Sequence, residues 1–383
     1  MDFTGQILGT RPERCANALC EARSFEIVRV GFTSPVECLQ GKRRQRFKCR
    51  VCSRSFTENF FKVHYRLRHK DPSLNYWIFI YFVHGMPLRR IAKLLRISVH
   101  STRIRINRMA KRALEFQLDV SSELRISEPI CIDGLENFAR SQYEPNNVNH
   151  AIGQDSLFTY DVNYACLNRK GRTSSHQKIR LSEIESVEGR FDPQAIRKSF
   201  GELVRRLNGR RKDKTKPLVV LSDEHFQYRR AIKYDLRDIE IEHGTISSKV
   251  ARNFQNILFS VNHSDLVIRK TIAPFARETI SFSKTHGMMM QKYGLYVVFK
   301  NYMQSQFTKK QKRRPRAHIE SPAMALGIFE RILDFEDIFS ERSVSAVGEK
   351  WSEDWRAFWH GQVPEIYHRS KKFVREKYKY QVA

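Results

Sequence analysis

The chain has 383 residues and carries 69 Lys and Arg against 41 Asp and Glu, a formal net charge of +28. This length is more than one small core normally organises, so two or three domains are expected. The charge is far from the balance of an ordinary metabolic enzyme. Because basic runs occur along the whole chain, the positive charge predicts a polyanionic partner.

The apolar segments and the cysteines indicate the compartment. The longest apolar run, Tyr76–Val83, is far shorter than the ~20 residues of a membrane-spanning helix. The first residues lack the apolar core of a secretory signal. We therefore expect a soluble protein in a reducing, intracellular compartment, where its seven cysteines are better explained as metal ligands or buried thiols than as disulfides.

Residues 10–60 hold five of the seven cysteines and little apolar periodicity, so a fold there needs a metal or a cross-link. The thiolates that suit tetrahedral Zn²⁺ form two short-range pairs, namely Cys15 and Cys20, and Cys49 and Cys52. They predict a structural zinc ribbon, against the alternative of unrelated buried thiols. Cys38 could replace Cys20 as a ligand, but we favour a place for it beneath the ribbon.

Residues 61–120 change to helical spacing of apolar residues. Within them, Gly85–Arg108 shows a short helix, a tight turn and a second helix. This is the length relation of a helix-turn-helix that enters the major groove of DNA. Packing between the two helices leaves four polar side chains for DNA: Ser101, Arg103, Arg105 and Arg108. The alternative is a plain helical hairpin with basic outer faces.

An α/β domain is expected over residues 127–310, where short apolar strands alternate with helical segments. The predicted strands are Pro129–Asp133, Leu157–Cys166, Pro217–Leu221 and Ile239–Ile241. The predicted helices are one capped by Asp192 that ends near Gly209, Glu224–Ile232, and a long one over Asp265–Met290 in which Pro274 is a candidate kink. Residues 311–383 are expected to form a basic tail with a helix over Ala323–Phe339.

Two predicted strands end on an acid, Asp133 and Asp223. Adjacent parallel strands would bring these side chains together although they are far apart in sequence. Converging carboxylates of this kind hold the two metal ions of phosphoryl transfer on DNA. A solvent-facing loop Asp is the alternative for either residue alone.

A third ligand is expected near the start of a helix after the next strand. There the sequence offers Asn262, His263 and Asp265, with Glu278 as a rival. Asp265 and Glu278 would be almost ~20 Å apart along one straight helix, so they cannot serve one site together. We favour Asp265 or Asn262.

The order of these parts resembles DDE-type insertion-element transposases, whose RNase H-like catalytic domain follows a zinc ribbon and a helix-turn-helix. The likeness covers roughly residues 10–310. It is carried by the cysteine pairs, Ile132-Asp133-Gly134, Leu221-Ser222-Asp223 and the block Ile268–Lys284. The block is similar to the basic helix after the third catalytic acid, which aligns that acid with Asn262. The carbonyl oxygen of an Asn can ligate Mg²⁺, and Asp265 lies one turn later.

The resemblance implies a multidomain α/β protein with an RNase H-like mixed sheet. It implies Mg²⁺- or Mn²⁺-dependent cleavage of element ends and strand transfer into double-stranded target DNA, by a bacterial, nucleoid-associated homodimer. It also implies that four basic side chains hold the DNA backbone: Arg269, Lys270, Arg277 and Lys284. The alternatives are a domesticated or impaired transposase that acts as a DNA-binding regulator, and a basic RNA binder, which we disfavour because aromatic residues do not alternate with the basic runs.

Overall fold

The computed structural model describes residues 6–7, 11–12, 15–17, 20–33, 43–57, 73–276, 281–306, 320–339 and 351–362. Chain contacts divide the protein into unit 1, Met1–Phe116 with Leu333–Ser352, and unit 2, Gln117–Ile332 with Glu353–Ala383. Some residues considered above lie outside the described ones: Cys38, Arg277, Glu278 and much of the tail over residues 311–383. None of the helices in the described part is long and apolar enough to cross a membrane.

Unit 1 begins with a small sheet. Its central strand is β3 (Arg43–Cys49), which pairs antiparallel with β2 (Ile27–Phe32) and β4 (Ser55–Thr57) and parallel with β1 (Gln6–Ile7). A short 3-10 helix, η1 (Ser24–Glu26), precedes β2. The core beneath the sheet is minimal, as expected for a segment with little apolar periodicity: Cys15, Ala16, Ala22, Ile27, Phe47, Cys49 and Phe56.

The helices of unit 1 are α1 (Leu74–Val83), α2 (Leu88–Leu94), α3 (Val99–Glu123) and α11 (Phe335–Phe339), and the boundary between the units falls within α3. Gly85 ends α1 with φ +89°, and Arg96 adopts φ +51° in the turn between α2 and α3. The ring of Phe79 packs 5.6 Å from Phe335 and 5.0 Å from Phe339. The predicted helix, turn and helix therefore form.

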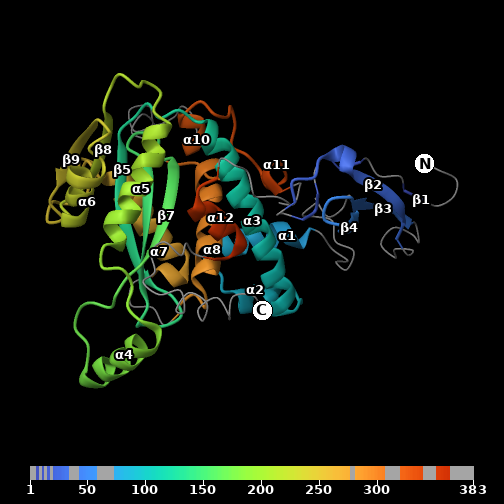
Figure 1. The fold of residues 1–383 in the computed structure, drawn as a ribbon, viewed down its shortest axis with the longest axis horizontal. Coiled ribbons are helices and arrows are strands. Elements are labelled where there is room, and N and C mark those ends of the chain that lie inside the picture. Colours follow the sequence, from blue (N-terminus) through green and yellow to red (C-terminus); the bar gives the residue numbers. More distant parts are fainter. Residues whose placement is uncertain are drawn as a thin grey trace. The chain divides into compact units, whose positions relative to one another are not determined.

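Unit 2 is built on a mixed five-stranded sheet with the order β7-β6-β5-β8-β9 (Figure 1). The strands are β5 (Ile130–Phe138), β6 (Pro145–Gly153), β7 (Thr159–Cys166), β8 (Leu218–Asp223) and β9 (Ile241–Ile246). β5, β6 and β7 pair antiparallel, whereas β5, β8 and β9 pair parallel. The chain thus leaves β5 on one side for β6 and returns on the other side for β8, and open α/β sheets form crevices at such a reversal.

Helices cover both faces of this sheet. On one face α5 (Ala195–Gly209) is tied to the strands by a hydrogen bond from Asn149 Nδ2 to Ser199 Oγ, 2.8 Å. On the other face α7 (Phe259–Thr271) packs Leu258 and Val261 into a cluster with Cys131, Ile152 and Leu221. The remaining helical segments are α4 (Ser175–Glu188), α6 (Phe226–Arg230), η4 (Ala231–Asp235), η5 (Ala273–Phe275), α8 (His286–Val298), η6 (Phe299–Met303), α10 (Pro322–Ala325) and α12 (Glu353–His360).

Two strands differ from the sequence-based expectation. β5 continues to Phe138, so Asp133 lies within the strand and not at its end. β6 is absent from the predicted strands, because its sequence contains three asparagines and a histidine and lacks a strand-like apolar pattern. These polar side chains are buried, and two of them belong to a row of hydrogen bonds that runs into β7: Asn147 donates to Asn149 at 2.7 Å, and Asn149 donates to Asn163 at 3.0 Å.

The predicted helices differ as well. The long helix over Asp265–Met290 was wrong: α7 ends at Thr271, Pro274 lies in the short η5, and α8 begins only at His286. Proline lacks the amide hydrogen that a helix interior needs, which explains the break. The tail helix expected over Ala323–Phe339 is two short helices, α10 and α11.

Candidate functional site

The four cysteines of the predicted zinc ribbon form one cluster. The Sγ atoms of Cys15 and Cys52 lie 3.5 Å apart, those of Cys20 and Cys49 lie 3.7 Å apart, and all four lie within 4.8 Å of one another. A tetrahedral Zn²⁺ with Zn–S bonds of about 2.3 Å holds its sulfur ligands about 3.8 Å apart. Since all four thiols are free, the cluster could bind a metal such as zinc.

The thiols of this cluster differ in acidity. Burial raises the pKa of the Cys15 thiol to about 12. Burial also opposes ionisation of Cys52, but hydrogen bonds from the Arg54 amide and from the other cluster thiols lower its pKa to about 7. One thiolate therefore forms most easily at Cys52. A bound cation would favour ionisation of the others.

The helix-turn-helix presents only part of the predicted DNA surface. Ser101 and Arg103 are half-buried on α3, and Arg103 reaches the ring of His100 at 3.3 Å. Arg105 is only 3 % exposed, and its guanidinium donates to Oδ1 of Asn75 at 2.8 Å. Arg105 therefore contributes to the packing of α1 on α3, contrary to its predicted exposure. Arg108 is half-buried like Ser101 and Arg103, and burial lowers its pKa to about 10.

The acidic residues of unit 2 converge at the strand reversal. The ladder between β5 and β8 is confined to Ile130↔Val220 and Cys131↔Leu221. Asp133 and Asp223 each lie two residues beyond the second pair, so both side chains are on the face that carries α7. A cavity of about 440 Å³ opens there, and it is lined by Asp133, Asp223 and, from α7, Asp265.

Of the two candidates for the third ligand, Asp265 and not Asn262 lines the cavity. Asn262 is absent from the lining residues and lies one turn earlier. Asp265 is not at a helix start as expected, because α7 begins at Phe259. Among the described residues, only the cysteine cluster brings three or more His, Cys, Asp or Glu ligand atoms within 4.8 Å of one another. The three carboxylates thus line the cavity, but their oxygen atoms do not all lie within 4.8 Å of one another.

The carboxylates influence one another electrostatically. Burial, and then the negative charges of Asp265 and Asp223, raise the pKa of Asp133 from 3.8 to about 7. The amide of Gly134 donates to Oδ1 of Asp133 at 2.7 Å and partly opposes this effect. Arg252 also partly opposes it. The remaining repulsion between the carboxylates makes the cavity an environment suited to a divalent cation.

His150 was missed from the sequence because β6 was missed. The β5–β6 register places it opposite Asp133, on the same face. Its Nε2 lies 2.7 Å from Oδ1 of Asp265, although not in the orientation of a hydrogen bond, and its Nδ1 lies 2.8 Å from the hydroxyl of Tyr293 on α8. His150 is fully buried. Because it does not line the cavity, it contacts Asp265 from the protein interior.

Basic side chains border the same cavity. Arg252 and Arg269 are among its lining residues. Arg269 also donates to the carbonyl oxygen of Phe275 at 3.1 Å. Of the other predicted DNA contacts, Lys270 and Lys284 are exposed. The cavity thus combines carboxylates with cations at its border.

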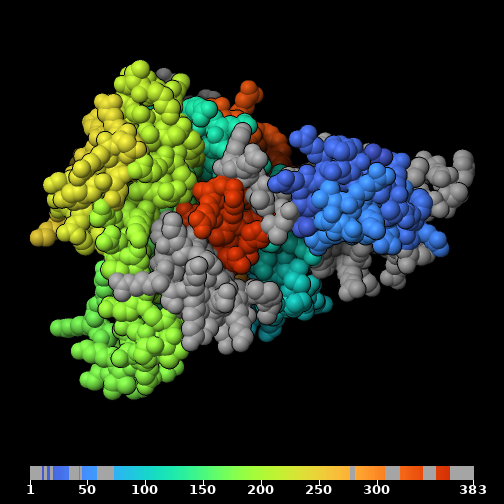
Figure 2. Space-filling view, viewed as in Figure 1, coloured from blue at the N-terminus to red at the C-terminus, as the bar shows by residue number. Residues whose placement is uncertain are grey.

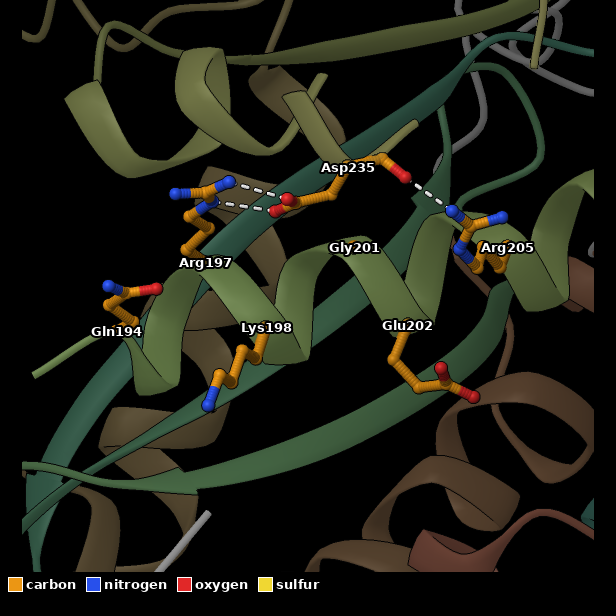
Figure 3. Close-up of a pocket in the computed structure, with 7 residues that line it drawn as sticks. All are labelled: Gln194, Arg197, Lys198, Gly201, Glu202, Arg205 and Asp235. Carbon is orange, nitrogen blue, oxygen red and sulfur yellow. Dashed lines mark hydrogen bonds and ion pairs between the residues drawn. The ribbon is translucent and has the colours of Figure 1, made fainter. Parts of the chain in front are cut away.

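A second cavity, of about 260 Å³, lies against α5 (Figure 3). Its cations are already paired: Arg197 binds Asp235 through two hydrogen bonds of 2.6 and 2.5 Å, and Lys198 Nζ lies 2.6 Å from Asp192. Arg205 bonds Asp238 at 2.7 Å. This neutralisation makes the cavity a poor anion site, so the acidic cavity is the stronger functional candidate.

No protein-family model matches the chain, and no curated protein matches it significantly.

Proposed function

We propose that this chain is a DDE-type transposase, which binds the ends of a DNA element and catalyses metal-dependent cleavage and strand transfer. One observation carries the proposal: Asp133 of β5, Asp223 of β8 and Asp265 of α7 line one cavity at the reversal of a mixed sheet. Carboxylates from separate elements at one point are what phosphoryl transfer with two metal ions requires. The net charge of +28 supports a polyanionic substrate.

The residues of the cavity fit a hard divalent cation. Its candidate ligands are carboxylate oxygens, which Mg²⁺ and Mn²⁺ prefer. The raised pKa of Asp133 arises from burial and from two like charges, and a cation between the three carboxylates would relieve that repulsion. When bound, Mg²⁺ or Mn²⁺ would polarise the scissile phosphate and promote ionisation of the attacking water or 3′ hydroxyl.

The side chains of the chain divide the remaining work. Asp133, Asp223 and Asp265 would hold the cations, and His150, which lies 2.7 Å from Oδ1 of Asp265 and does not line the cavity, would orient that carboxylate. Arg252 and Arg269 at the cavity would attract the DNA backbone and orient the phosphate. We assign the third position to Asp265 because Asn262 does not line the cavity.

Unit 1 would select the DNA. We propose that the Cys15, Cys20, Cys49 and Cys52 cluster binds a structural Zn²⁺ and that α3 of the helix-turn-helix enters the major groove. Of the four predicted contacts, the half-buried Ser101, Arg103 and Arg108 keep this role, whereas Arg105 is buried. Because transposition joins two element ends, we expect a homodimer in the DNA complex.

The test incubates the protein with Mg²⁺ or Mn²⁺ and labelled DNA duplexes that carry the inverted repeats flanking its gene, and it measures cleavage of these duplexes. Asp133→Asn, Asp223→Asn and Asp265→Asn should abolish cleavage but retain DNA binding, whereas Asn262→Ala should still cut. Cleavage by Asp133→Asn at the parental rate would refute the assignment of the site. DNA binding by the parent protein with no strand breakage under either metal would instead favour a DNA-binding regulator.

A further inference from the structure

An exposed stripe of alternating aromatic and basic residues follows β8 directly. It consists of Phe226, Arg230, Lys233, Tyr234 and Arg237, which we call the Phe226–Arg237 stripe. Phe226, Arg230, Lys233 and Tyr234 lie in the helical segment α6–η4. Arg237 lies in the turn after η4, where its contact with the ring of Tyr234 joins it to the others. Phe226 is 55 % exposed and Tyr234 is 48 % exposed. In the space-filling view, the yellow segment that contains α6 and η4 is at the surface of unit 2 (Figure 2).

The rings and the cations of the stripe touch one another. The Arg230 guanidinium lies 5.6 Å from the centroid of Phe226, and Lys233 Nζ and the Arg237 guanidinium lie 5.4 and 5.5 Å from that of Tyr234. Within the described part of the chain, none of these three cations forms an ion pair with a carboxylate, whereas the nearby Arg229 is paired with Glu224. The stripe therefore keeps its positive charge.

The stripe is continuous with the acidic cavity. The ring of Phe226 stacks on that of His225, with centroids 5.1 Å apart and planes inclined by 24°. His225 lines the cavity together with Asp223. A strand held at Asp223 would therefore meet Phe226 next and Tyr234 further along α6–η4.

We propose that the Phe226–Arg237 stripe binds an unpaired segment of the DNA strand that leaves the acidic cavity. Exposed rings framed by cations suit this ligand, because bases stack on the rings while the cations contact phosphates. Paired bases in a duplex hide their faces from such rings. This inference rests on the proposed function, since the cavity supplies the strand.

The test measures binding of the full-length chain to fluorescent dT oligonucleotides and to a blunt duplex of equal length, by anisotropy without added divalent cation. Phe226→Ala with Tyr234→Ala should weaken binding of the dT oligonucleotide about thirtyfold, which corresponds to two stacking contacts at the lower end of the base-stacking effect, and should leave duplex binding nearly unchanged. The control removes two exposed apolar side chains elsewhere, Ile179→Ala with Val187→Ala on α4, which are 63 % and 62 % exposed.

The cations are tested by a second pair of variants. Lys233→Gln with Arg237→Gln should lower the slope of log K against log salt for the dT oligonucleotide by about 1.4, the loss of two single-strand phosphate contacts. Arg172→Gln with Lys178→Gln removes equal charge from exposed positions around α4 and should keep the slope.

Two results would overturn the inference: parental binding of dT by the ring variant, or equal weakening of dT and duplex, which would mean that the rings only position the cations. Because the assay needs no cleavage, it separates the two proposals. Ring-dependent dT binding without metal-dependent cleavage would count against the transposase alone. If the parent protein cleaves DNA and the ring variant binds dT as tightly as the parent does, the result would count against the stripe alone.

Discussion

Nε2 of His150 lies 2.7 Å from Oδ1 of Asp265, which joins a central strand to the helix packed on it. Tyr293 approaches the other ring nitrogen at 2.8 Å. Each partner of His150 can be removed separately, because the side-chain nitrogen of Gln reaches the place of Nε2 and the polar atoms of Asn reach only that of Nδ1.

We therefore expect His150→Asn to weaken Mn²⁺ binding about tenfold or more, the usual effect of losing a group that orients a ligand. His150→Gln should stay close to the parental affinity. Isothermal titration calorimetry measures both, and circular dichroism verifies that each variant folds. Equal affinities for the two variants and the parent would show that His150 has no positioning role.

Asp133 should make stability depend on pH when no divalent cation is present. Burial and the charges of Asp265 and Asp223 raise its pKa from 3.8 to about 7, so the folded state keeps a proton that the unfolded state releases. Stability should therefore fall as pH rises from about 4 to about 7 and then level off. Asp133→Asn carries no such proton and should gain stability relative to the parent over this range, by at most about 4 kcal/mol.

Urea unfolding at about pH 4, 5.5 and 8 measures this difference. Added Mn²⁺ should stabilise the parent at the highest pH, but not the variant. A constant difference across the pH range would contradict the raised pKa.

The cysteine cluster should be needed for the fold at the start of unit 1, whose core has few buried residues. Cys20→Ser removes one ligand, so the purified variant should contain less than the one zinc ion per chain expected of the parent. Cys166→Ala is the control, because this buried thiol of β7 lies outside the cluster. Elemental analysis by mass spectrometry tests both, and full zinc content in Cys20→Ser would exclude the four-cysteine site.

Two neighbouring arginines of α3 should have opposite phenotypes. Arg103→Gln should change stability by less than about 0.5 kcal/mol and lower the salt slope of duplex binding by about 0.9. Arg105→Gln should instead destabilise unit 1 by about 1–3 kcal/mol, because it disturbs the buried bond to Asn75. Thermal unfolding and anisotropy separate the two effects. A folded Arg105→Gln protein with impaired DNA binding would restore its predicted role at the interface.

The features that the sequence predicted well were local. The close cysteine pairs, the helix-turn-helix spacing and the apolar run before Asp223 each depend on a few neighbouring residues, and each corresponds to an element of the structure. The parallel pairing of β5 with β8 also agrees with the prediction. These patterns sufficed to predict that Asp133 and Asp223 lie near one another.

The features that it missed depend on distant partners. The asparagines of β6 look like a turn until their buried partners are known, and without β6 neither His150 nor its contact with Asp265 could be foreseen. The choice of Asp265 over Asn262 likewise required the start and rotation of α7. The aromatic and basic residues of the Phe226–Arg237 stripe are close together in the sequence, but only the fold shows that their rings are exposed and in contact with the cations.

The tail beyond residue 311 offers the last prediction, because α12 belongs to the core of unit 2. Arg206 of α5 donates to Asp161 of β7 at 3.1 Å and to Asp354 of α12 at 2.7 Å. The indole Nε1 of Trp355 also donates to Asp161, at 2.9 Å. The local sequence around Glu353–His360 does not predict this network, because the residues that α12 contacts are more than a hundred residues away in the sequence.

We expect Arg206→Met to destabilise unit 2 by about 3 kcal/mol, because two buried carboxylates lose their shared cation. The matched control is Arg205→Met, which removes the exposed pair with Asp238 and should cost at most about 1 kcal/mol. Urea unfolding measures both, and a red shift of tryptophan emission should accompany only the first, as Trp355 becomes hydrated. Adding Asp354→Leu to Arg206→Met should recover part of the loss, since Arg210 still neutralises Asp161 at 2.6 Å. Equal stability of the two single variants would mean that α12 is held by apolar packing alone.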